Sequence, residues 1–288
     1  MADHAIAVSG LTYHYGEKVA VDRLDFEVSV GEIIGFLGPN GAGKTTTVKM
    51  LTGQLKPRDG KALVLGLDVA REAHRVQAGI GVCFEQTNLY EKMSAAANLR
   101  LFARLFGVRP FDPEDLLAKV GLPGKGRDKV ETFSKGMKQR LMVARAMVSR
   151  PRILFLDEPT SGLDPSSAQD IRRLILAERD RGATVFLTTH DMVEADKLSD
   201  RVAFMNQGRI VAFDTPHNLK QRHGRRALKA QVASADGALS EREVNLDEPG
   251  TAEAVRRLFA DEKVVTVHSA EATLEDIFIE ATGRGLEA

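Results

Sequence analysis

Short apolar runs alternate along the chain with longer stretches in which apolar residues recur at helical spacing. Strands are expected over residues 32–37, 153–156 and 184–187, and a helix over residues 45–51. This alternation is typical of an α/β protein with a mainly parallel sheet. Each of the three strands runs into polar residues, and ligands bind beyond the carboxyl ends of parallel strands. The polar clusters are therefore expected to converge on one site.

Two other patterns flank this α/β core. Partial alternation over residues 6–8, 11–15 and 24–28 predicts an antiparallel β layer. Residues 94–107 and 112–120 have helical spacing and form a candidate helical insertion. The apolar side of this insertion is expected to hold Leu99, Phe102, Leu105 and Phe106.

The last part of the chain has a different character. The polar, basic segment 218–226 is a candidate linker, followed by strands over residues 227–232 and 263–268 and helices over residues 251–259 and 273–281. Thr273 and Asp276 have the spacing of a capping box. Net charge is positive before Arg225 and negative from Arg225 onward, which agrees with two units. We expect one α/β domain over residues 1–220 and a small α+β domain over residues 221–288.

Composition narrows the possible classes of protein. The 288 residues are 43% hydrophobic, yet the longest apolar stretches fall far short of the roughly 18 residues that a membrane span needs. The N-terminus has no basic start with an apolar block, so secretion is not indicated. One cysteine, Cys83, agrees with a reducing cytoplasm. Basic and acidic residues both number 40, so no charge excess indicates nucleic acid as a partner.

The strongest chemical signal lies between the first predicted strand and its helix. The run from Gly38 to Thr45 fits the phosphate-loop pattern G-x-x-x-x-G-K-[ST]. Glycines let backbone N–H groups curl around phosphates, and the helix N-terminus adds partial positive charge. Lys44 is expected to reach the β- and γ-phosphates, and the Thr45 hydroxyl to ligate Mg²⁺.

Two further strand ends carry side chains that suit phosphate hydrolysis. Asp157 and Glu158 end a buried strand, where Asp157 suits holding Mg²⁺ and Glu158 suits a general base for the attacking water. An apolar strand ending in Asp-Glu is more often structural when it stands alone, and the upstream phosphate loop favours the catalytic interpretation. His190 follows the third strand and could contact the γ-phosphate. Ser134 can cap a helix that starts just before the Asp157 strand.

These four elements, in this order, resemble the ATPases of ABC transporters over residues 5–218. The resemblance implies an ABC-type ATPase domain with a P-loop NTPase core and a helical subdomain at about residues 88–150. The resemblance also implies that Glu158 and His190 are catalytic and that Thr45, Gln86 and Asp157 bind Mg²⁺. The residues expected to bind ATP are Tyr15, Gly38, Pro39, Asn40, Gly41, Ala42, Gly43, Lys44, Thr45, Thr46, Gln86, Ser134, Lys135, Gly136, Met137 and Asp164.

One element departs from the family pattern. Family members most often read Ser-Gly-Gly-Gln in the signature loop, whereas this chain reads Ser-Lys-Gly-Met from Ser134 to Met137. Met137 cannot supply the Gln amide, and Lys135 replaces a glycine. Lys138, Gln139 or Lys135 could compensate. Bacterial drug and lipid exporter ATPases often show Gly-Met-Lys-Gln at this place, and residues 273–283 resemble the end of such exporter ATPases.

The resemblance also implies partners. ATP hydrolysis would power export through separate membrane-spanning subunits, with two ATPase subunits paired head to tail at the cytoplasmic face of the membrane. Residues 88–97 are the candidate contact with a membrane subunit. The competing hypothesis is an ABC-type ATPase that acts on DNA or ribosomes, although such proteins typically carry two cassettes or a long coiled coil. A P-loop kinase or GTPase would not explain the Ser134 element or His190.

Overall fold

The computed structural model of the chain describes residues 4–223, 227–234, 238–270 and 272–283. It divides into two compact units, the first ending at Phe213 and the second starting at Asp214. No helix in these described ranges combines the length and the apolar character that crossing a bilayer requires.

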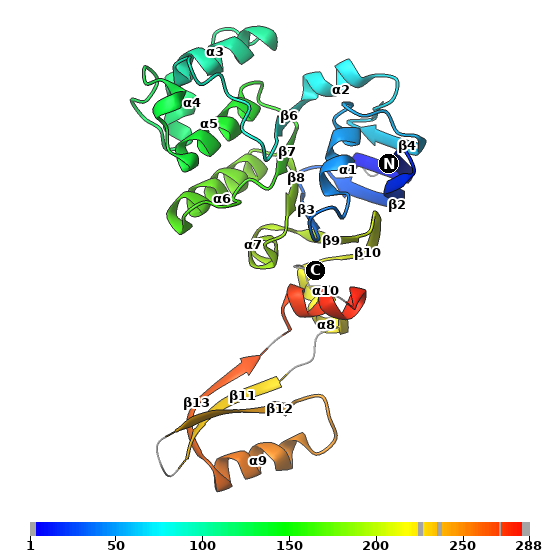
Figure 1. Cartoon of the computed structure of the whole chain (residues 1–288), viewed down its shortest axis with the longest axis vertical. Helices are drawn as coiled ribbons and strands as arrows, with labels where there is room; N and C mark the ends of the chain where they lie inside the picture. Colours follow the sequence, from blue (N-terminus) through cyan, green and yellow to red (C-terminus); the bar gives the residue numbers. More distant parts are fainter. Residues whose placement is uncertain (1–3, 224–226, 235–237, 271, 284–288) are drawn as a thin grey trace. The chain divides into compact units, whose positions relative to one another are not determined.

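A six-stranded sheet forms the centre of the first unit, in the order β10, β9, β3, β8, β7, β6 (Figure 1). Its strands are β3 (Ile33–Leu37), β6 (Ile80–Cys83), β7 (Ile153–Asp157), β8 (Thr184–Thr189), β9 (Arg201–Asn206) and β10 (Arg209–Asp214). β3 pairs in parallel with β8 and β9, and β7 pairs in parallel with β6 and β8. The prediction of an α/β fold with a mainly parallel sheet is therefore confirmed.

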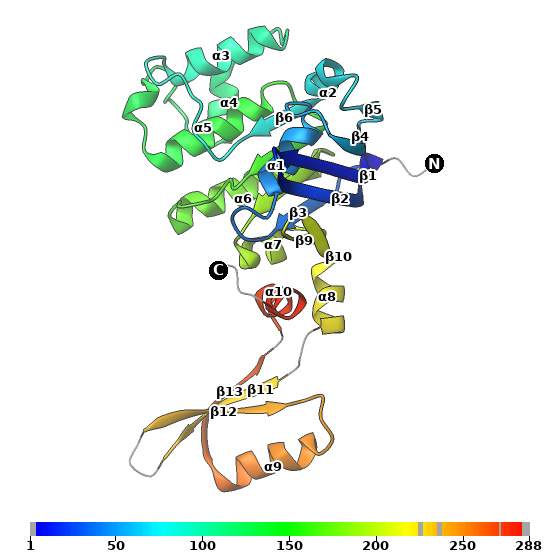
Figure 2. The ribbon, with the colours of Figure 1, turned by 45° about the vertical axis from the view of Figure 1, so that its right-hand side comes forward.

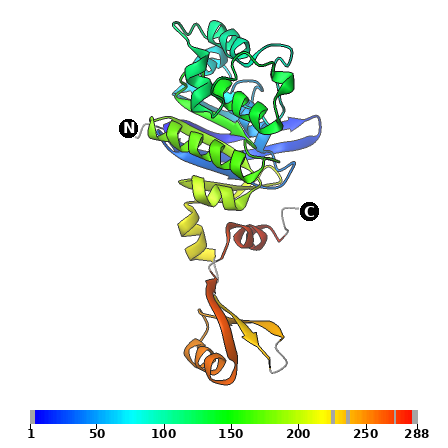
Figure 3. The ribbon, with the colours of Figure 1, turned by 90° about the vertical axis from the view of Figure 1, so that its left-hand side faces the viewer.

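The three central strands are buried along their whole length because both faces of the sheet are covered. Ile33, Leu156 and Leu187 pack on one side with α3 (Ala95–Leu105), α4 (Pro113–Lys119), α5 (Lys135–Met147) and α6 (Pro165–Asp180). Figure 3 shows α6 lying across this side of the sheet. Phe36 and Phe186 pack on the other side, where their ring centroids lie 4.5 Å apart.

An antiparallel layer covers the second side, as predicted. It consists of β2 (Lys18–Ser29), β1 (His4–Tyr15), β4 (Asp59–Val64) and β5 (Leu67–Asp68) in that order. Figure 2 shows β1 and β2 beside α1 (Lys44–Leu51). The apolar runs at residues 6–8 and 11–15 belong to one strand, because Gly10 at φ 59° shifts the register without ending it. The remaining elements are α2 (Ala73–Gly79), α7 (Met192–Leu198) and a 3-10 turn at Val130–Thr132.

The expected apolar side of the helical insertion is only partly correct. Leu99 is fully buried and Phe102 is partly buried, but Leu105 is 69% exposed and Phe106 is 44% exposed. Ala95, Leu99 and Ala103 form the buried stripe of α3, with a spacing of four residues. Leu105, the last residue of the helix, lies outside this stripe.

The second unit contains α8 (Pro216–His223), β11 (Ala227–Ala233), β12 (Leu239–Asn245), α9 (Thr251–Asp261), β13 (Lys263–Ala270) and α10 (Leu274–Thr282). Its sheet is antiparallel in the order β12, β11, β13, and Ala230, Val232 and Leu258 form a small core. The capping box is confirmed, since Thr273 Oγ1 accepts from Asp276 N at 3.1 Å and Asp276 Oδ2 accepts from Thr273 N at 2.9 Å. These bonds hold the pKa of Asp276 below its usual value.

The linker prediction is wrong over residues 218–223, which are helical. The Thr215 hydroxyl accepts from Asn218 N at 3.1 Å and Pro216 opens α8, so a capped helix begins where the polar composition indicated a loop. Residues 224–226 of the predicted linker lie outside the described residues. Strand β12 was not predicted, because its residues are mostly charged or polar and exposed, and only its pairing with β11 makes it a strand.

Candidate functional site

The loop between β3 and α1 can be built only with glycine at two positions. Gly38 has φ 156° and Gly43 has φ 110°. A Cβ on Gly38 would lie 2.1 Å from Met205 O, and one on Gly43 would lie 2.4 Å from Ala20 O. The loop therefore curls tightly against β9 and β2 and presents its backbone at the start of α1, the arrangement that binds phosphates.

Lys44 lies at the bottom of this loop and is 6% exposed. Its Nζ donates to Gly38 O at 2.6 Å and to Pro39 O at 3.2 Å, and it lies 3.6 Å from Glu158 Oε1. Burial lowers the pKa of Lys44, while the carboxylates of Glu158 and Asp157 oppose that shift. The loop thus holds a cation beside two carboxylates, where an anionic phosphate can bind.

Asp157 ends β7 and is bound by hydroxyls from both neighbouring elements. Thr45 Oγ1 donates to Asp157 Oδ2 at 2.9 Å, and Thr188 Oγ1 donates to Asp157 Oδ1. Mg²⁺ takes oxygen ligands and usually binds through one or two protein groups together with substrate phosphates. The adjacent Thr45 hydroxyl and Asp157 carboxylate fit that requirement, and no group of three or more His, Cys, Asp or Glu within the described ranges forms a metal cage.

Glu158 adopts a strained backbone conformation at the next position. Its φ of 50° is uncommon for a residue with a side chain, and such strain clusters at functional sites. Glu158 N donates to Thr188 O at 3.0 Å, and Glu158 Oε2 lies 2.9 Å from His190 Nδ1. Glu158 is 8% exposed, and its Oε1 has no hydrogen-bond partner among the described residues. The carboxylate is thus fixed by His190 through Oε2, while Oε1 faces the Lys44 ammonium at 3.6 Å.

A cavity of about 210 Å³ opens above this cluster. It is lined by Tyr15, Lys18, Ala20, Pro39, Asn40, Gly41, Ala42, Gly43, Lys44, Thr45, Thr46, Glu85 and Glu158. Tyr15 is 48% exposed, and its ring meets Tyr13 edge-on with centroids 4.9 Å apart. Tyr15 therefore adds an exposed aromatic ring to the lining of the cavity. The structure therefore brings Tyr15 and most of the phosphate loop to one cavity.

Gln86 is exposed and does not line this cavity, whereas its neighbour Glu85 does. Glu85 also lines a second cavity of about 370 Å³, together with Glu158 and Lys135. Its carboxylate raises the pKa of Lys44, the same effect that Asp157 and Glu158 have. The sequence analysis did not identify Glu85, because Glu85 and Gln86 are adjacent and the sequence alone does not show which side chain lines the cavity.

The Ser134 element is a capped helix start, as expected. Ser134 Oγ accepts from Met137 N at 3.2 Å, Gly136 is buried and Met137 packs against the core. Lys135 lines the second cavity, and a Cβ on Gly162 would lie 2.2 Å from its Nζ, so the Lys135 ammonium lies over the loop after Glu158. Lys138 is ion-paired with Glu91 at 2.6 Å. Lys135 and Lys138 both line the second cavity, which Glu158 also lines.

Asp164 caps the next helix, α6. Its Oδ1 accepts from Ser166 N at 3.1 Å and from Ser167 N at 3.0 Å. These backbone bonds hold the pKa of Asp164 below its usual value. Within the described residues Asp164 therefore acts as an N-cap, and it does not line either cavity that contains Glu158.

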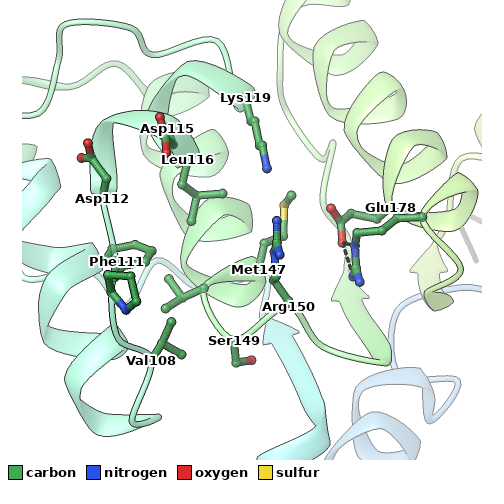
Figure 4. A pocket seen from close by; sticks show the side chains of 13 residues that line it. Val108, Phe111, Asp112, Asp115, Leu116, Lys119, Met147, Ser149, Arg150 and Glu178 are labelled. Atoms are coloured by element: carbon green, nitrogen blue, oxygen red, sulfur yellow. Dashed lines mark hydrogen bonds and ion pairs between the residues drawn. The ribbon is translucent and has the colours of Figure 1, made fainter.

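A separate cavity of about 380 Å³ lies between α4, the end of α5 and α6 (Figure 4). Lys119, Arg150 and Glu178 line it, and Glu178 is ion-paired with Arg181 at 2.6 Å. Arg181 also donates to Pro151 O at 2.9 Å, so its guanidinium already has protein partners. This cavity contains none of the residues of the phosphate loop.

Comparison with known proteins decides the family. The fluoroquinolones export ATP-binding protein of Mycobacterium tuberculosis is 44% identical over 283 residues, which cover 98% of this chain and 94% of that protein. The chain belongs to the ABC transporter ATP-binding proteins. The family description "ABC transporter" matches residues 21–161. As a member of this family, the chain is an ATPase with an ATP-binding P-loop core.

Other relatives of this ABC ATPase carry similar names. A daunorubicin resistance ATP-binding protein of Streptomyces coeruleorubidus is 42% identical, over 78% of this chain and 72% of that protein. A Nod factor export ATP-binding protein of Mesorhizobium japonicum is 35% identical, over 98% of this chain and 88% of that protein. A solved ATP-binding subunit of an ABC transporter superposes with a TM-score of 0.69 at 28% identity, covering 76% of this chain and 92% of that one.

Proposed function

We propose that this ABC ATPase hydrolyses ATP to power export of a substrate through separate membrane-spanning subunits. One observation carries the proposal: the Lys44 ammonium, the Asp157 carboxylate and the Glu158–His190 pair meet at the carboxyl ends of β3, β7 and β8. Relatives that share nearly the whole chain are named as export ATP-binding proteins, which supports export. The alternative of a DNA- or ribosome-bound ATPase has no comparable support.

The side chains divide the work of hydrolysis between them. The phosphate loop and Lys44 bind the phosphates, and Tyr15 stacks on the base. Thr45 and Asp157 would hold Mg²⁺, which neutralises phosphate charge when bound. Glu158 orients the attacking water and accepts its proton through Oε1, the oxygen without a hydrogen-bond partner among the described residues. His190 holds the other oxygen of Glu158 at 2.9 Å and faces the γ-phosphate.

We assign the remaining predicted residues to a pair of ATPase subunits. The loop from Ser134 to Met137 opens α5 with its capped N-terminus, which suits contact with a phosphate bound by a second subunit. We assign the lost polar contact of the usual signature to Lys135, because Lys138, the other cation of this cavity, is ion-paired with Glu91. We also propose that the second unit, which starts at Asp214 and contains α8, is an accessory domain that follows the ATPase domain in the sequence.

A groove beside the helical subdomain suits a membrane subunit at the cytoplasmic face of the membrane. It has a volume of about 230 Å³ and is lined by Thr52, Gln54, Gln77, Ile80, Gly81, Val82, Phe102, Phe106, Arg145 and Ala146. Arg145 Nη1 donates to Asn88 O at 2.7 Å, and its guanidinium carbon lies 4.8 Å from the centre of the Phe102 ring. Residues 88–97, the predicted contact, are thereby tied to α5, the signature helix.

Recovery with a membrane partner tests the transport proposal. The tagged full chain is expressed in its native cells, membranes are solubilised, and magnesium-dependent ATPase activity is measured in the recovered complex. We expect the chain to co-purify with a membrane-spanning protein and to drive ATP-dependent efflux in cells. Co-sedimentation with ribosomes or DNA, without recovery from membranes, would instead favour the non-transport alternative.

Glu85 is proposed to act at the nucleotide cavity in addition to Gln86. Glu85→Ala is expected to lower the ATPase rate by roughly tenfold, in the range seen for outer partners of metal sites. Glu114→Ala is the matched control and should stay within about twofold of the wild-type rate, because Glu114 is exposed on α4 and lines neither cavity that contains Glu158. Steady-state ATPase assays of the two variants test the assignment, and a wild-type rate for Glu85→Ala would contradict it.

A further inference from the structure

Glu194 is a buried acid that the proposed hydrolysis does not use. It lies in the first turn of α7, the helix that starts just after His190, and is 2% exposed. Its Oε2 accepts from the Thr160 hydroxyl, and Thr160 stands two residues after Glu158. Glu194 therefore joins the segment that follows the catalytic glutamate to the segment that follows His190.

Two links now connect the same pair of segments. The direct link is the contact of 2.9 Å between His190 Nδ1 and Glu158 Oε2. The second link runs from Thr160 to Glu194, and Glu194 N is fixed in turn by Asp191 Oδ1 at 2.9 Å. The two links close a ring through both chain segments, so rotation of the His190 segment away from Glu158 requires the Thr160 bond to break.

Glu194 also has a charged neighbour. Burial raises the pKa of this carboxyl, although the Thr160 bond and the Arg172 charge oppose the shift. Glu194 Oε1 lies 3.8 Å from Arg172 Nε, and both atoms are buried without a hydrogen-bond partner among the described residues. Removing one member of a buried ion pair destabilises a protein, because the other charge is left unpaired. A substitution at Thr160 leaves the Glu194–Arg172 pair in place, so it tests the Thr160 bond without that loss.

We propose that Glu194 is a positioning residue for ATP hydrolysis, which fixes His190 against Glu158 through its bond to Thr160. The inference rests on the roles proposed above for Glu158 and His190. Binding of ATP does not involve the Thr160–Glu194 bond, because neither Thr160 nor Glu194 lines the nucleotide cavity. Cutting the bond should therefore slow turnover without weakening the affinity for ATP.

Thr160→Val tests the link, because valine keeps the shape of threonine and removes the hydroxyl. We expect kcat to fall by about tenfold or more, the scale of effect that small misplacements of catalytic groups produce, with the KM for ATP within about twofold of wild type. Thr160→Ser, which restores the hydroxyl, should recover kcat. Thr132→Val is the matched control, since the Thr132 hydroxyl donates to Lys129 O within its own turn and is exposed.

Two double variants test whether the Thr160–Glu194 bond acts through His190. Combining Thr160→Val with Glu194→Leu should lower kcat no further than Glu194→Leu alone, and adding Thr160→Val to His190→Ala should have no further effect. A wild-type kcat for Thr160→Val, a failure of Thr160→Ser to recover, or additive losses in these pairs would overturn the inference. The failure of the proposed function is seen separately, as an absence of magnesium-dependent ATPase activity in the wild-type full chain.

Discussion

Glu158→Gln should nearly abolish ATP turnover while leaving ATP binding intact. A general base contributes about 10²- to 10⁴-fold to a rate, and the amide cannot accept the proton of the attacking water. Gln keeps the size of Glu, and an amide oxygen can still accept a hydrogen bond from His190. Because Lys44 keeps its bonds to Gly38 O and Pro39 O, the phosphate loop should remain formed.

Single-turnover hydrolysis and equilibrium nucleotide binding measure these two effects separately. We also expect the variant to accumulate as an ATP-bound dimer, visible as a change in mass on size-exclusion chromatography. Glu114→Gln, an exposed acid on α4 remote from the phosphate loop, serves as the control and should hydrolyse ATP at the wild-type rate. Wild-type turnover by Glu158→Gln would show that Glu158 is not the general base.

Lys44→Met should weaken ATP binding by roughly ten- to a hundredfold, the equivalent of one hydrogen bond to a charged group. The ammonium is 6% exposed and is held inside the loop, so the phosphates would lose their one buried cation among the residues lining the cavity. Methionine has a similar length and carries no charge. The loss should appear in the dissociation constant as well as in turnover, which distinguishes this variant from Glu158→Gln.

Isothermal titration with ATP and magnesium measures the change. Lys49→Met, on the same helix but not among the residues that line the cavity, should bind ATP as the wild type does. Thermal unfolding of both variants separates lost affinity from lost structure, because a cooperative transition must persist in each. Unchanged ATP affinity in a folded Lys44→Met variant would contradict the proposed phosphate site.

Local patterns predicted the parts of the chain whose structure depends on neighbours in sequence. Buried apolar runs gave β3, β7 and β8, and the spacing of Thr273 and Asp276 gave the capping box of α10. The phosphate loop followed from glycine and lysine at fixed offsets, since those offsets set the backbone geometry directly. Composition misled at residues 218–223, where a polar segment with a good cap forms α8.

By itself, the sequence determined that three strand ends would carry the chemistry of a phosphate-hydrolysing site. Only the tertiary structure decided which of Glu85 and Gln86 lines the cavity, because the turn after β6 sets that orientation. It also decided the partners of Asp157 and Glu194, since the Thr188 and Thr160 hydroxyls reach them across 31 and 34 residues of chain. Such bonds depend on how strands and helices pack, and the spacing of residues along the chain does not predict that packing.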